Sequence, residues 1–193
     1  HPKSPPGSSR WIVEGGKYRT RETGDNESIN GCKYLKNYEV LVNIQKSTDH
    51  AQGNYFGLIL RSPPDLNNAT SGYYMVRVVC FSCEGTNSSS HRYRLELVDK
   101  QGPYDSVLTS VDLEPSEFSF LTGKDYTLKA IVTDDVLIGK FWKSSELEPS
   151  DDPADTPKSA NPPEPARNGR TIKTSNSSYS QGKIGVASNT SKN

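Results

Sequence analysis

Residues 73–81, Tyr-Tyr-Met-Val-Arg-Val-Val-Cys-Phe, decide the fold, because their side chains alternate between two environments. Successive side chains of a β-strand point to opposite faces, so Val76 and Val78 belong to one face and Arg77 to the other. The same alternation recurs at residues 55–61, 93–99, 126–133 and 137–142. Several short alternating strands separated by turn residues predict an all-β sandwich of antiparallel sheets.

The alternation assigns these side chains to two sets. The apolar set is predicted to line the core: Leu58, Leu60, Val76, Val78, Tyr93, Leu95, Leu97, Leu128 and Ala130. The other parity carries Arg61, Arg77, Arg94, Lys129, Lys140 and Trp142, which we expect to share the opposite face. Guanidinium groups beside an indole suit polar, ring-shaped ligands, so this second set predicts a glycan-binding surface.

Shorter segments extend the strand pattern in both directions. Residues 11–21 predict two short strands around the turn Glu14-Gly15-Gly16, and residues 34–45 predict a strand. The inward side chains of that strand would be Tyr38, Val40, Val42 and Ile44. Further strands are expected at residues 102–110, 117–120 and 182–187, and the strands at 126–133 and 137–142 should form a hairpin around Asp134-Asp135.

Length and composition favour one domain. The 193 residues fit a single sandwich at residues 11–190, and the Pro/Ser lead-in at residues 1–10 is expected to be mobile. Six prolines and few hydrophobic residues mark residues 143–174 as a long insert that leaves and rejoins the same fold. With 23 basic and 23 acidic residues, the chain lacks the strong field of nucleic-acid-binding proteins, so nucleic acid is not an expected partner.

Secretion is the expected localisation. No run approaches the roughly 18 apolar residues of a membrane span, so we do not expect membrane insertion. Because the chain starts at His1 rather than Met, a signal peptide, a tag or a preceding domain could have been removed. Five Asn-X-Ser/Thr triplets, expected in loops or at ends, are candidate N-glycosylation sites: Asn26, Asn68, Asn87, Asn176 and Asn189.

The three cysteines permit two interpretations. We favour one disulfide, either between Cys80 and Cys83 or from Cys32 to one of them, which leaves one thiol over. Zinc coordination by the three cysteines with His91 is the alternative. A redox-catalytic role for the pair is not expected, because no helix pattern follows to lower a thiol pKa.

Other metals have weaker signals. A leading His1 with His50 or His91 has the composition of a copper site, but neither partner lies in a motif that supports one. Asp65, Asn67 and Asn68 could bind structural calcium, although the same residues commonly form turns. The prediction is therefore no cofactor, with structural calcium as the open alternative.

The order of several motifs resembles the concanavalin A-like, laminin-G-type jelly roll. The motifs are Trp11-Ile-Val-Glu-Gly-Gly-Lys-Tyr18, Asn37-Tyr-Glu-Val40, Tyr55-Phe-Gly-Leu-Ile-Leu-Arg61, Gly72-Tyr-Tyr-Met-Val-Arg-Val78, Asp125-Tyr-Thr-Leu-Lys-Ala-Ile-Val132 and Gly182-Lys-Ile-Gly-Val186. Among these modules the chain looks most similar to the sugar-related domains grouped with 3-keto-disaccharide hydrolases. The resemblance implies two antiparallel sheets with ligands on the concave sheet or its rim loops. The insert at residues 143–174 is longer than the usual final loop.

An enzyme is the less favoured interpretation. Glycoside hydrolysis needs two carboxylates that flank one bond. The Glu-X-Asp-X-X-Glu strand of glucanases in this superfamily is missing, and Glu96 and Asp99 have a spacing that places them on opposite faces of a strand. Glu96 is in phase with Arg94, so an ion pair between these two is expected instead.

A lectin-like module that binds a polysaccharide or glycan is therefore the predicted function. The predicted ligand-binding residues are Arg61, Arg77, Arg94, Glu96, Lys129, Trp142 and Asn43, with Tyr74 and Tyr104 as further candidates. The cluster of cations suggests a carboxylated or sulfated glycan. The competing interpretations are a glycoside hydrolase and a protein-interaction or adhesion module that binds another protein through the Pro-rich insert. A solvated sheet with Trp142 packed beneath the insert would explain the same residues without any ligand.

Overall fold

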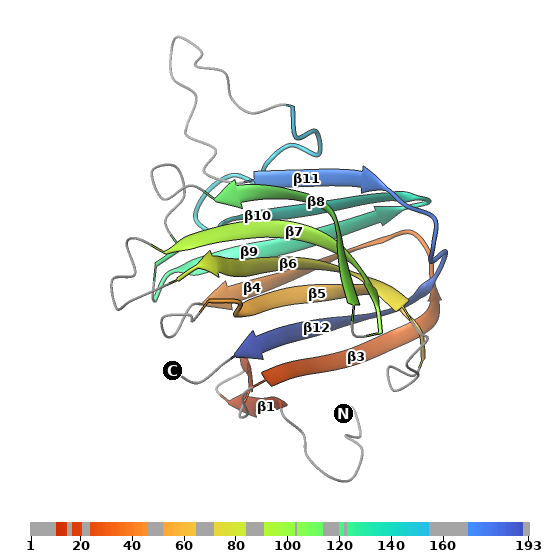
Figure 1. Cartoon of the computed structure of the whole chain (residues 1–193), viewed down its shortest axis with the longest axis horizontal. Coiled ribbons are helices and arrows are strands. Elements are labelled where there is room, and N and C mark those ends of the chain that lie inside the picture. The colour runs from red at the N-terminus through yellow and green to blue at the C-terminus, as the bar shows by residue number, and fades with distance from the viewer. Residues whose placement is uncertain are drawn as a thin grey trace.

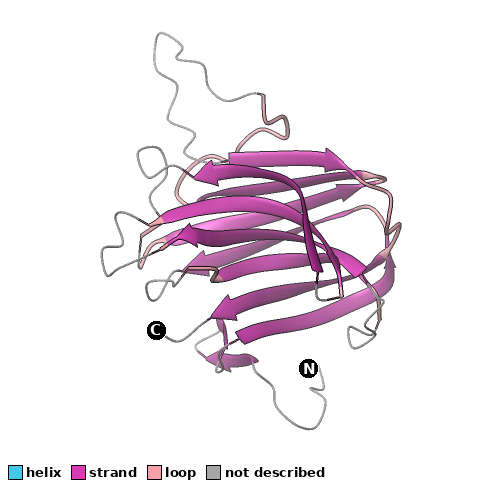
Figure 2. Ribbon diagram, viewed as in Figure 1, coloured by secondary structure: helices cyan, strands magenta, loops and turns pink. Residues whose placement is uncertain are grey.

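The computed structural model describes residues 11–14, 17–20, 24–45, 52–64, 72–83, 91–102, 104–113, 120–121, 123–154 and 170–190. Within these ranges all regular structure is β-strand, as Figure 2 shows. The described part of the chain contains no helix with the length and apolar character of a membrane span.

Two antiparallel sheets form a sandwich (Figure 1). The six-stranded sheet has the order β3 (Gly24–Leu35), β12 (Gly182–Thr190), β5 (Tyr55–Ser62), β6 (Gly72–Ser82), β7 (Arg92–Gln101) and β8 (Tyr104–Leu113). The four-stranded sheet has the order β11 (Arg170–Ser175), β10 (Val136–Lys143), β9 (Asp125–Thr133) and β4 (Tyr38–Gln45). A separate hairpin joins β1 (Trp11–Glu14) to β2 (Lys17–Thr20). The predicted fold class, an all-β sandwich of two antiparallel sheets, is confirmed.

The inner faces of the two sheets enclose one hydrophobic core. All nine side chains of the predicted apolar set are buried in it. The four inward residues predicted for strand β4 are partly buried and pack against the same core: Tyr38, Val40, Val42 and Ile44. At roughly 25 cal/mol per Å² of buried apolar area, this burial from both sheets is the main favourable contribution to folding.

Aromatic rings fill one part of this core. The Phe120 ring packs against Phe56, Tyr93, Tyr126 and Phe141 with centroid distances of 4.6–5.6 Å. These rings come from β5 and β7 in one sheet and from β9 and β10 in the other. Tilted and edge-on aromatic pairs of this kind each contribute about 0.5–1.5 kcal/mol beyond area burial. Phe120 therefore fastens the two sheets together.

Most of the predicted strands are present. The hairpin of β1 and β2, the hairpin of β9 and β10 and the closing strand β12 lie where the pattern predicted them. The strand predicted at residues 34–45 is instead the end of β3, a bend and then β4. Strand β3 has no alternating apolar pattern and was missed. The strand predicted at 117–120 lies almost wholly outside the described residues.

The Pro-rich insert is shorter than predicted. Residues 170–175 form strand β11, which pairs with β10 along its full length from Arg170 to Ser175. The sequence contains little sign of this strand, because Ile172 is its only apolar residue. The Ile172 side chain is buried in the core. An edge strand such as β11 pairs on one side only, so it needs few apolar residues to be held in the sheet.

Candidate functional site

The predicted ligand-binding residues do not share one face. Arg77, Arg94 and Glu96 lie on the outer side of the six-stranded sheet, since their neighbours Val76, Val78, Leu95 and Leu97 face the core. The outer side of the four-stranded sheet carries Lys129, Lys140, Trp142 and Asn43. Their sequence neighbours Leu128, Phe141 and Val42 point into the core. The expectation of a single shared face is therefore wrong. Alternation shows which side chains of one strand point the same way, but it does not show to which sheet that strand belongs.

The outer side of β6, β7 and β8 carries a connected set of ion pairs, which we call the charged face: Arg77, Arg94, Glu96, Lys100, Asp105 and Asp112. Arg77 is its centre. Its Nη2 lies 2.9 Å from Glu96 Oε2, and its Nη1 lies 2.6 Å from Asp105 Oδ2. Lys100 Nζ contacts the other Asp105 oxygen at 3.0 Å. One guanidinium thus holds two carboxylates, and one of those carboxylates also holds an ammonium group.

The strand register explains why these groups meet. Arg77 stands directly opposite Glu96 in the β6–β7 pair, and Asp105 stands opposite Lys100 in the β7–β8 pair. Cross-strand neighbours lie within side-chain reach, and opposite charges at such positions attract. A register shift between Leu97 and Val98 moves the β8 side chains along the sheet, so that Asp105 and Asp112 both reach the outer face despite their odd separation in sequence.

Arg94 forms the outer rim of the charged face. Its Nε donates to Asp112 Oδ1 at 2.6 Å, and its guanidinium lies 4.4 Å from the Phe81 ring centroid. At the centre, Arg77 lies 5.2 Å from the ring centroid of Tyr55. Each guanidinium is therefore flanked by a carboxylate and an aromatic ring, which fixes its plane.

Arg77 and Asp105 shift each other's pKa values in the direction that favours the ionised forms. Burial by itself would raise the pKa of Asp105, but hydrogen bonds from Arg77 and Lys100 outweigh it and lower the pKa below its usual value. Burial would also lower the pKa of Arg77, whereas the carboxylates of Glu96 and Asp105 raise it. Arg77 and Asp105 therefore stay ionised around neutral pH.

A small apolar cluster adjoins the charged face on the same side of the sheet: Tyr55, Ile59, Tyr73, Met75 and Ala187. The Tyr73 hydroxyl donates to Glu27 of β3. Burial first, and the Glu27 carboxylate second, raise the pKa of Tyr73 far above its usual range, so this phenol remains a donor. The side thus combines apolar rings with oriented donors and acceptors.

Residues 144–154, the start of the insert, cover part of the outer side of the four-stranded sheet at Lys129 and Lys140, and we call this segment the strap. Lys140 is 3% exposed, and its ammonium group contacts Glu148, Asp151 and the carbonyl of Pro149. Lys129 lies 2.9 Å from Glu39 and 3.1 Å from Glu148. Lys129, a predicted ligand-binding residue, and Lys140 therefore both hold the strap.

Trp142 shares this side and is only 5% exposed. An indole so deeply covered offers no open plate on which a sugar ring could stack. Asn43 remains exposed on β4, where its side-chain oxygen accepts from Thr127 at 3.1 Å.

Arg61 serves the fold. It is 2% exposed, has a positive φ of 52°, and donates to the carbonyls of Tyr179, Lys36 and Asp134. Tyr74 is fully buried and donates its hydroxyl to Asn176, whereas Tyr104 is 77% exposed beside the β7–β8 turn. Of these candidates only Tyr104 is open to a ligand.

The carboxylates Glu96 and Asp99 lie on opposite faces of β7, as predicted. Glu96 faces outward to Arg77, and Asp99 Oδ1 accepts from the Tyr179 hydroxyl at 2.9 Å. The partner of Glu96 differs from the prediction, because Arg77 rather than Arg94 stands opposite it.

The disulfide joins Cys80 and Cys83, and Cys32 is an exposed free thiol on β3. This is one of the two pairings expected from the sequence. The zinc set that included Cys32 is not assembled, because β12 and β5 separate β3 from β6 in the sheet.

Several candidates lie outside the described residues. These are His1 and His50 of the copper alternative, the calcium candidates Asp65, Asn67 and Asn68, and the triplet at Asn87. Asn26 and Asn189 lie in strands β3 and β12 rather than in loops. The side-chain oxygen of Asn176 accepts from Tyr74 at 2.7 Å, so this asparagine supports the fold.

The sequence analysis missed the acidic half of the charged face, Asp105 and Asp112, together with Lys100. Their signal was weak because the register shift in β8 breaks the simple alternation that identified the other residues. Glu148 was missed because it lies in the Pro-rich segment, where no periodic pattern indicates packing.

Solved structures with a similar fold include two carbohydrate-binding modules. One is the carbohydrate-binding module CBM66 from Bacillus subtilis, with a TM-score of 0.56 and 14% identity over 92% of this chain and 81% of that one. The other is the CBM2 module of the evolved Dit protein of Lactobacillus casei BL23 phage J-1, with a TM-score of 0.58 and 10% identity over 95% of this chain and 73% of that one. No protein-family model and no curated protein sequence matches the chain. At these identities the likeness establishes a common β-sandwich fold.

Proposed function

We propose that the chain is a non-catalytic carbohydrate-binding module of the concanavalin A-like, laminin-G-type class, and that it binds glycans on the outer side of the six-stranded sheet. The observation that carries the proposal is the charged face centred on Arg77. Both similar structures are described as carbohydrate-binding modules, which supports the same role by analogy of fold.

The charged face has the groups that sugar hydroxyls need. Carboxylates accept hydrogen bonds and guanidinium groups donate them, and charged partners give shorter and stronger bonds than neutral ones. Because the ion pairs fix these groups before a ligand arrives, little side-chain entropy is lost on binding. Phe81 adds partly exposed apolar ring surface next to the polar groups, whereas Tyr55 is buried and supports Arg77 from within the sheet.

Charge balance favours a neutral glycan over an acidic one. The three cations of the charged face, Arg77, Arg94 and Lys100, are each paired with a carboxylate. Their partners, Glu96, Asp105 and Asp112, bring the sum of the six charges to zero. The sequence-based preference for a sulfated or carboxylated glycan rested on the cations alone, and a negative ligand would now meet three carboxylates.

An extracellular location is part of this proposal. The disulfide between Cys80 and Cys83 and the Asn-X-Ser/Thr triplets are features of chains that mature in an oxidising compartment. Glu96 and Asp99, the carboxylates considered from the sequence, point to opposite faces of β7, so hydrolysis by this pair is not proposed.

The test is a glycan array of neutral β-glucans, fructans, mannans and xylans beside pectin and heparin. The test variant Arg94→Gln/Asp112→Asn removes one exposed ion pair without changing net charge. The control variant Lys143→Gln/Glu146→Gln does the same at the strap, where the two groups lie 3.4 Å apart. We expect binding to a neutral polysaccharide that the test variant weakens about tenfold, or roughly 1.4 kcal/mol, and that the control preserves.

Binding that fails only in the strap control would move the site to the four-stranded sheet. Absence of binding to every glycan by folded protein would refute the proposal and favour the protein-interaction alternative.

A further inference from the structure

A second chemical site lies at the end of the β6–β7 hairpin. Cys80 ends the core-facing side of β6, Cys83 follows its last residue, and His91 immediately precedes β7. A ligand atom from each of these three residues lies within 4.8 Å of the others, and all three side chains are buried. The charged face occupies other residues, so this cluster is independent of the proposed glycan site.

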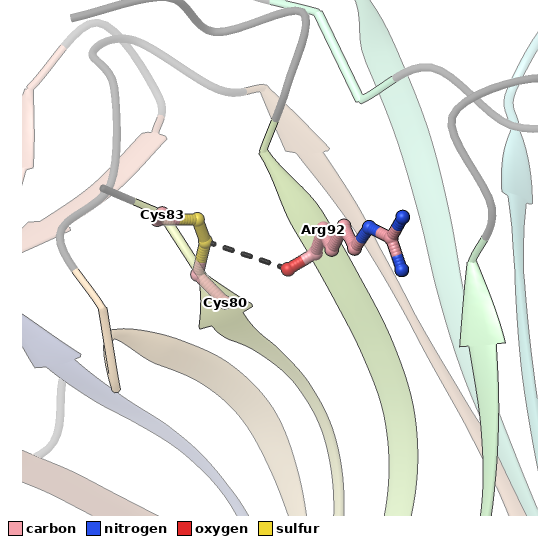
Figure 3. Close-up of a disulfide and its surroundings, with 3 residues drawn as sticks. All are labelled: Cys80, Cys83 and Arg92. Atoms are coloured by element: carbon pink, nitrogen blue, oxygen red, sulfur yellow. Dashed lines mark hydrogen bonds between the residues drawn. A yellow bond between two sulfur atoms is a disulfide. The ribbon is translucent and has the colours of Figure 1, made fainter. Parts of the chain in front are cut away.

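The hairpin geometry produces the cluster. Strands β6 and β7 pair until Ser82 stands opposite Arg92, with a register shift between Cys80 and Ser82. The shift turns the chain so that Cys83 returns toward Cys80, as Figure 3 shows. Cys80 Sγ also lies 3.6 Å from the carbonyl oxygen of Arg92, which anchors the cysteine beside the first residues of β7 (Figure 3). His91 is therefore held next to both sulfur atoms by strand pairing.

The donor set selects a particular class of metal. Two thiolates and one imidazole suit borderline and soft cations such as Zn²⁺, which prefers sulfur and nitrogen ligands in tetrahedral geometry. Calcium and magnesium need oxygen ligands, and the cluster offers none from side chains. Three protein ligands leave a fourth position for solvent.

We propose that Cys80, Cys83 and His91 bind Zn²⁺ when the disulfide is reduced, so that disulfide and metal are alternative states of one site. Reduction by a dithiol or phosphine adds two electrons and two protons and breaks the sulfur–sulfur bond, giving two thiols. Zinc binding then releases the two thiol protons and forms two metal–thiolate bonds. Reoxidation to the disulfide expels the metal, because the same sulfur atoms cannot serve both bonds.

The disulfide and the bound metal would each stabilise the end of the β6–β7 hairpin, because the cysteines are buried there. Cys80 and Cys83 belong to the main core, and Cys80 stands opposite Tyr93 in the β6–β7 pair, so a bond that links the two sulfur atoms to a neighbour restrains this end of the core. A metal bridging Cys83 to His91 closes the β6–β7 connection, as the disulfide closes the shorter loop from Cys80 to Cys83. Binding to the folded state should thus raise the midpoint of thermal unfolding of reduced protein.

The experiment is a titration of Co²⁺ into the full chain after phosphine reduction and anaerobic removal of the phosphine. Co²⁺ is the probe because thiolate-to-cobalt charge-transfer and visible d–d bands report sulfur ligands and tetrahedral geometry. We expect one equivalent to bind reduced protein, displacement by Zn²⁺, and no bands in the oxidised protein. Zn²⁺ should also raise the unfolding midpoint of the reduced protein only.

Three variants define the ligands. Cys83→Ser should abolish the charge-transfer bands, His91→Gln should keep them but weaken Co²⁺ affinity at least tenfold, and Cys32→Ser should leave the titration unchanged. Reduced protein that is folded by circular dichroism and shows no bands would overturn the proposal. Bands that vanish in Cys32→Ser, or that persist at full affinity in His91→Gln, would overturn this ligand set.

Discussion

Arg77 and Asp105 form a 2.6 Å ion pair across two strand boundaries, from β6 to β8, with Lys100 of β7 closing the gap between them. The pair ties the edge strand β8 to the middle of the six-stranded sheet. It also orients a carboxylate that is 30% exposed at its side chain and can still accept hydrogen bonds from a ligand. Structure and proposed recognition therefore depend on the same three side chains.

The strap depends on Glu148, which accepts from both Lys140 and Lys129. Glu148→Gln should lower the free energy of unfolding by about 1–2 kcal/mol, because it leaves the buried Lys140 with a weaker partner. It should also speed proteolysis within residues 144–154. Urea unfolding and limited proteolysis measure the two effects. Asp135→Asn is the control, since it changes an exposed carboxylate in the β9–β10 turn; equal effects of the two variants would contradict this role of Glu148.

Stability should fall in acid. Burial would raise the pKa values of Glu148 and Asp105. Hydrogen bonds from Lys140 and Lys129 instead lower the pKa of Glu148 below its usual value, and those from Arg77 and Lys100 do the same for Asp105. A carboxyl group with a depressed folded-state pKa stabilises the fold above its unfolded pKa and loses that contribution as pH falls through the folded value. Unfolding midpoints should be flat between about pH 6 and pH 8 and should drop below about pH 4.5. Glu148→Gln should reduce the size of this drop; an unchanged drop would show that other groups control it.

Arg61 should behave as a structural residue. Arg61→Ala removes donors to three carbonyls that belong to separate turns and leaves a space at a position that is 2% exposed. We expect a loss of about 2–4 kcal/mol in urea unfolding. Arg94→Ala, at a 33% exposed side chain, should cost under about 1 kcal/mol. Similar losses for the two variants would contradict the assignment of Arg61 to the fold.

The packing of one sheet on the other can be tested at Gly139. A Cβ there would lie 2.7 Å from Val76 and 3.2 Å from Ile172, so Gly139→Ala should destabilise the fold by about 1–3 kcal/mol. Adding Val76→Ala should recover part of that loss, because it vacates the contact across the sandwich. Double-mutant analysis of urea unfolding measures the coupling. Strictly additive effects would mean that the two residues do not meet.

The sequence predicted the sandwich better than the site, for physical reasons that particular residues illustrate. Leu95 and Leu97 predict a strand with one face in the core, because burial of one face places apolar side chains at every second residue. Arg77 and Lys129 both alternate with core residues, but they lie on the outer sides of different sheets. Pairing between distant strands decides this placement, and the alternation within one strand does not encode that pairing. Asp105 was hidden by a register shift, and the partners of Lys140 lie in a segment without periodicity.

The most direct test of the central claim is calorimetric titration of the neutral polysaccharide that the array identifies, using wild-type protein, Asp105→Asn and Lys173→Gln. Asp105 belongs to the charged face, and Lys173 is an exposed residue on the outer side of the four-stranded sheet. The account predicts that Asp105→Asn weakens binding about tenfold, or roughly 1.4 kcal/mol, and that Lys173→Gln leaves it unchanged. Full affinity in Asp105→Asn together with loss in Lys173→Gln would contradict a glycan site on the six-stranded sheet.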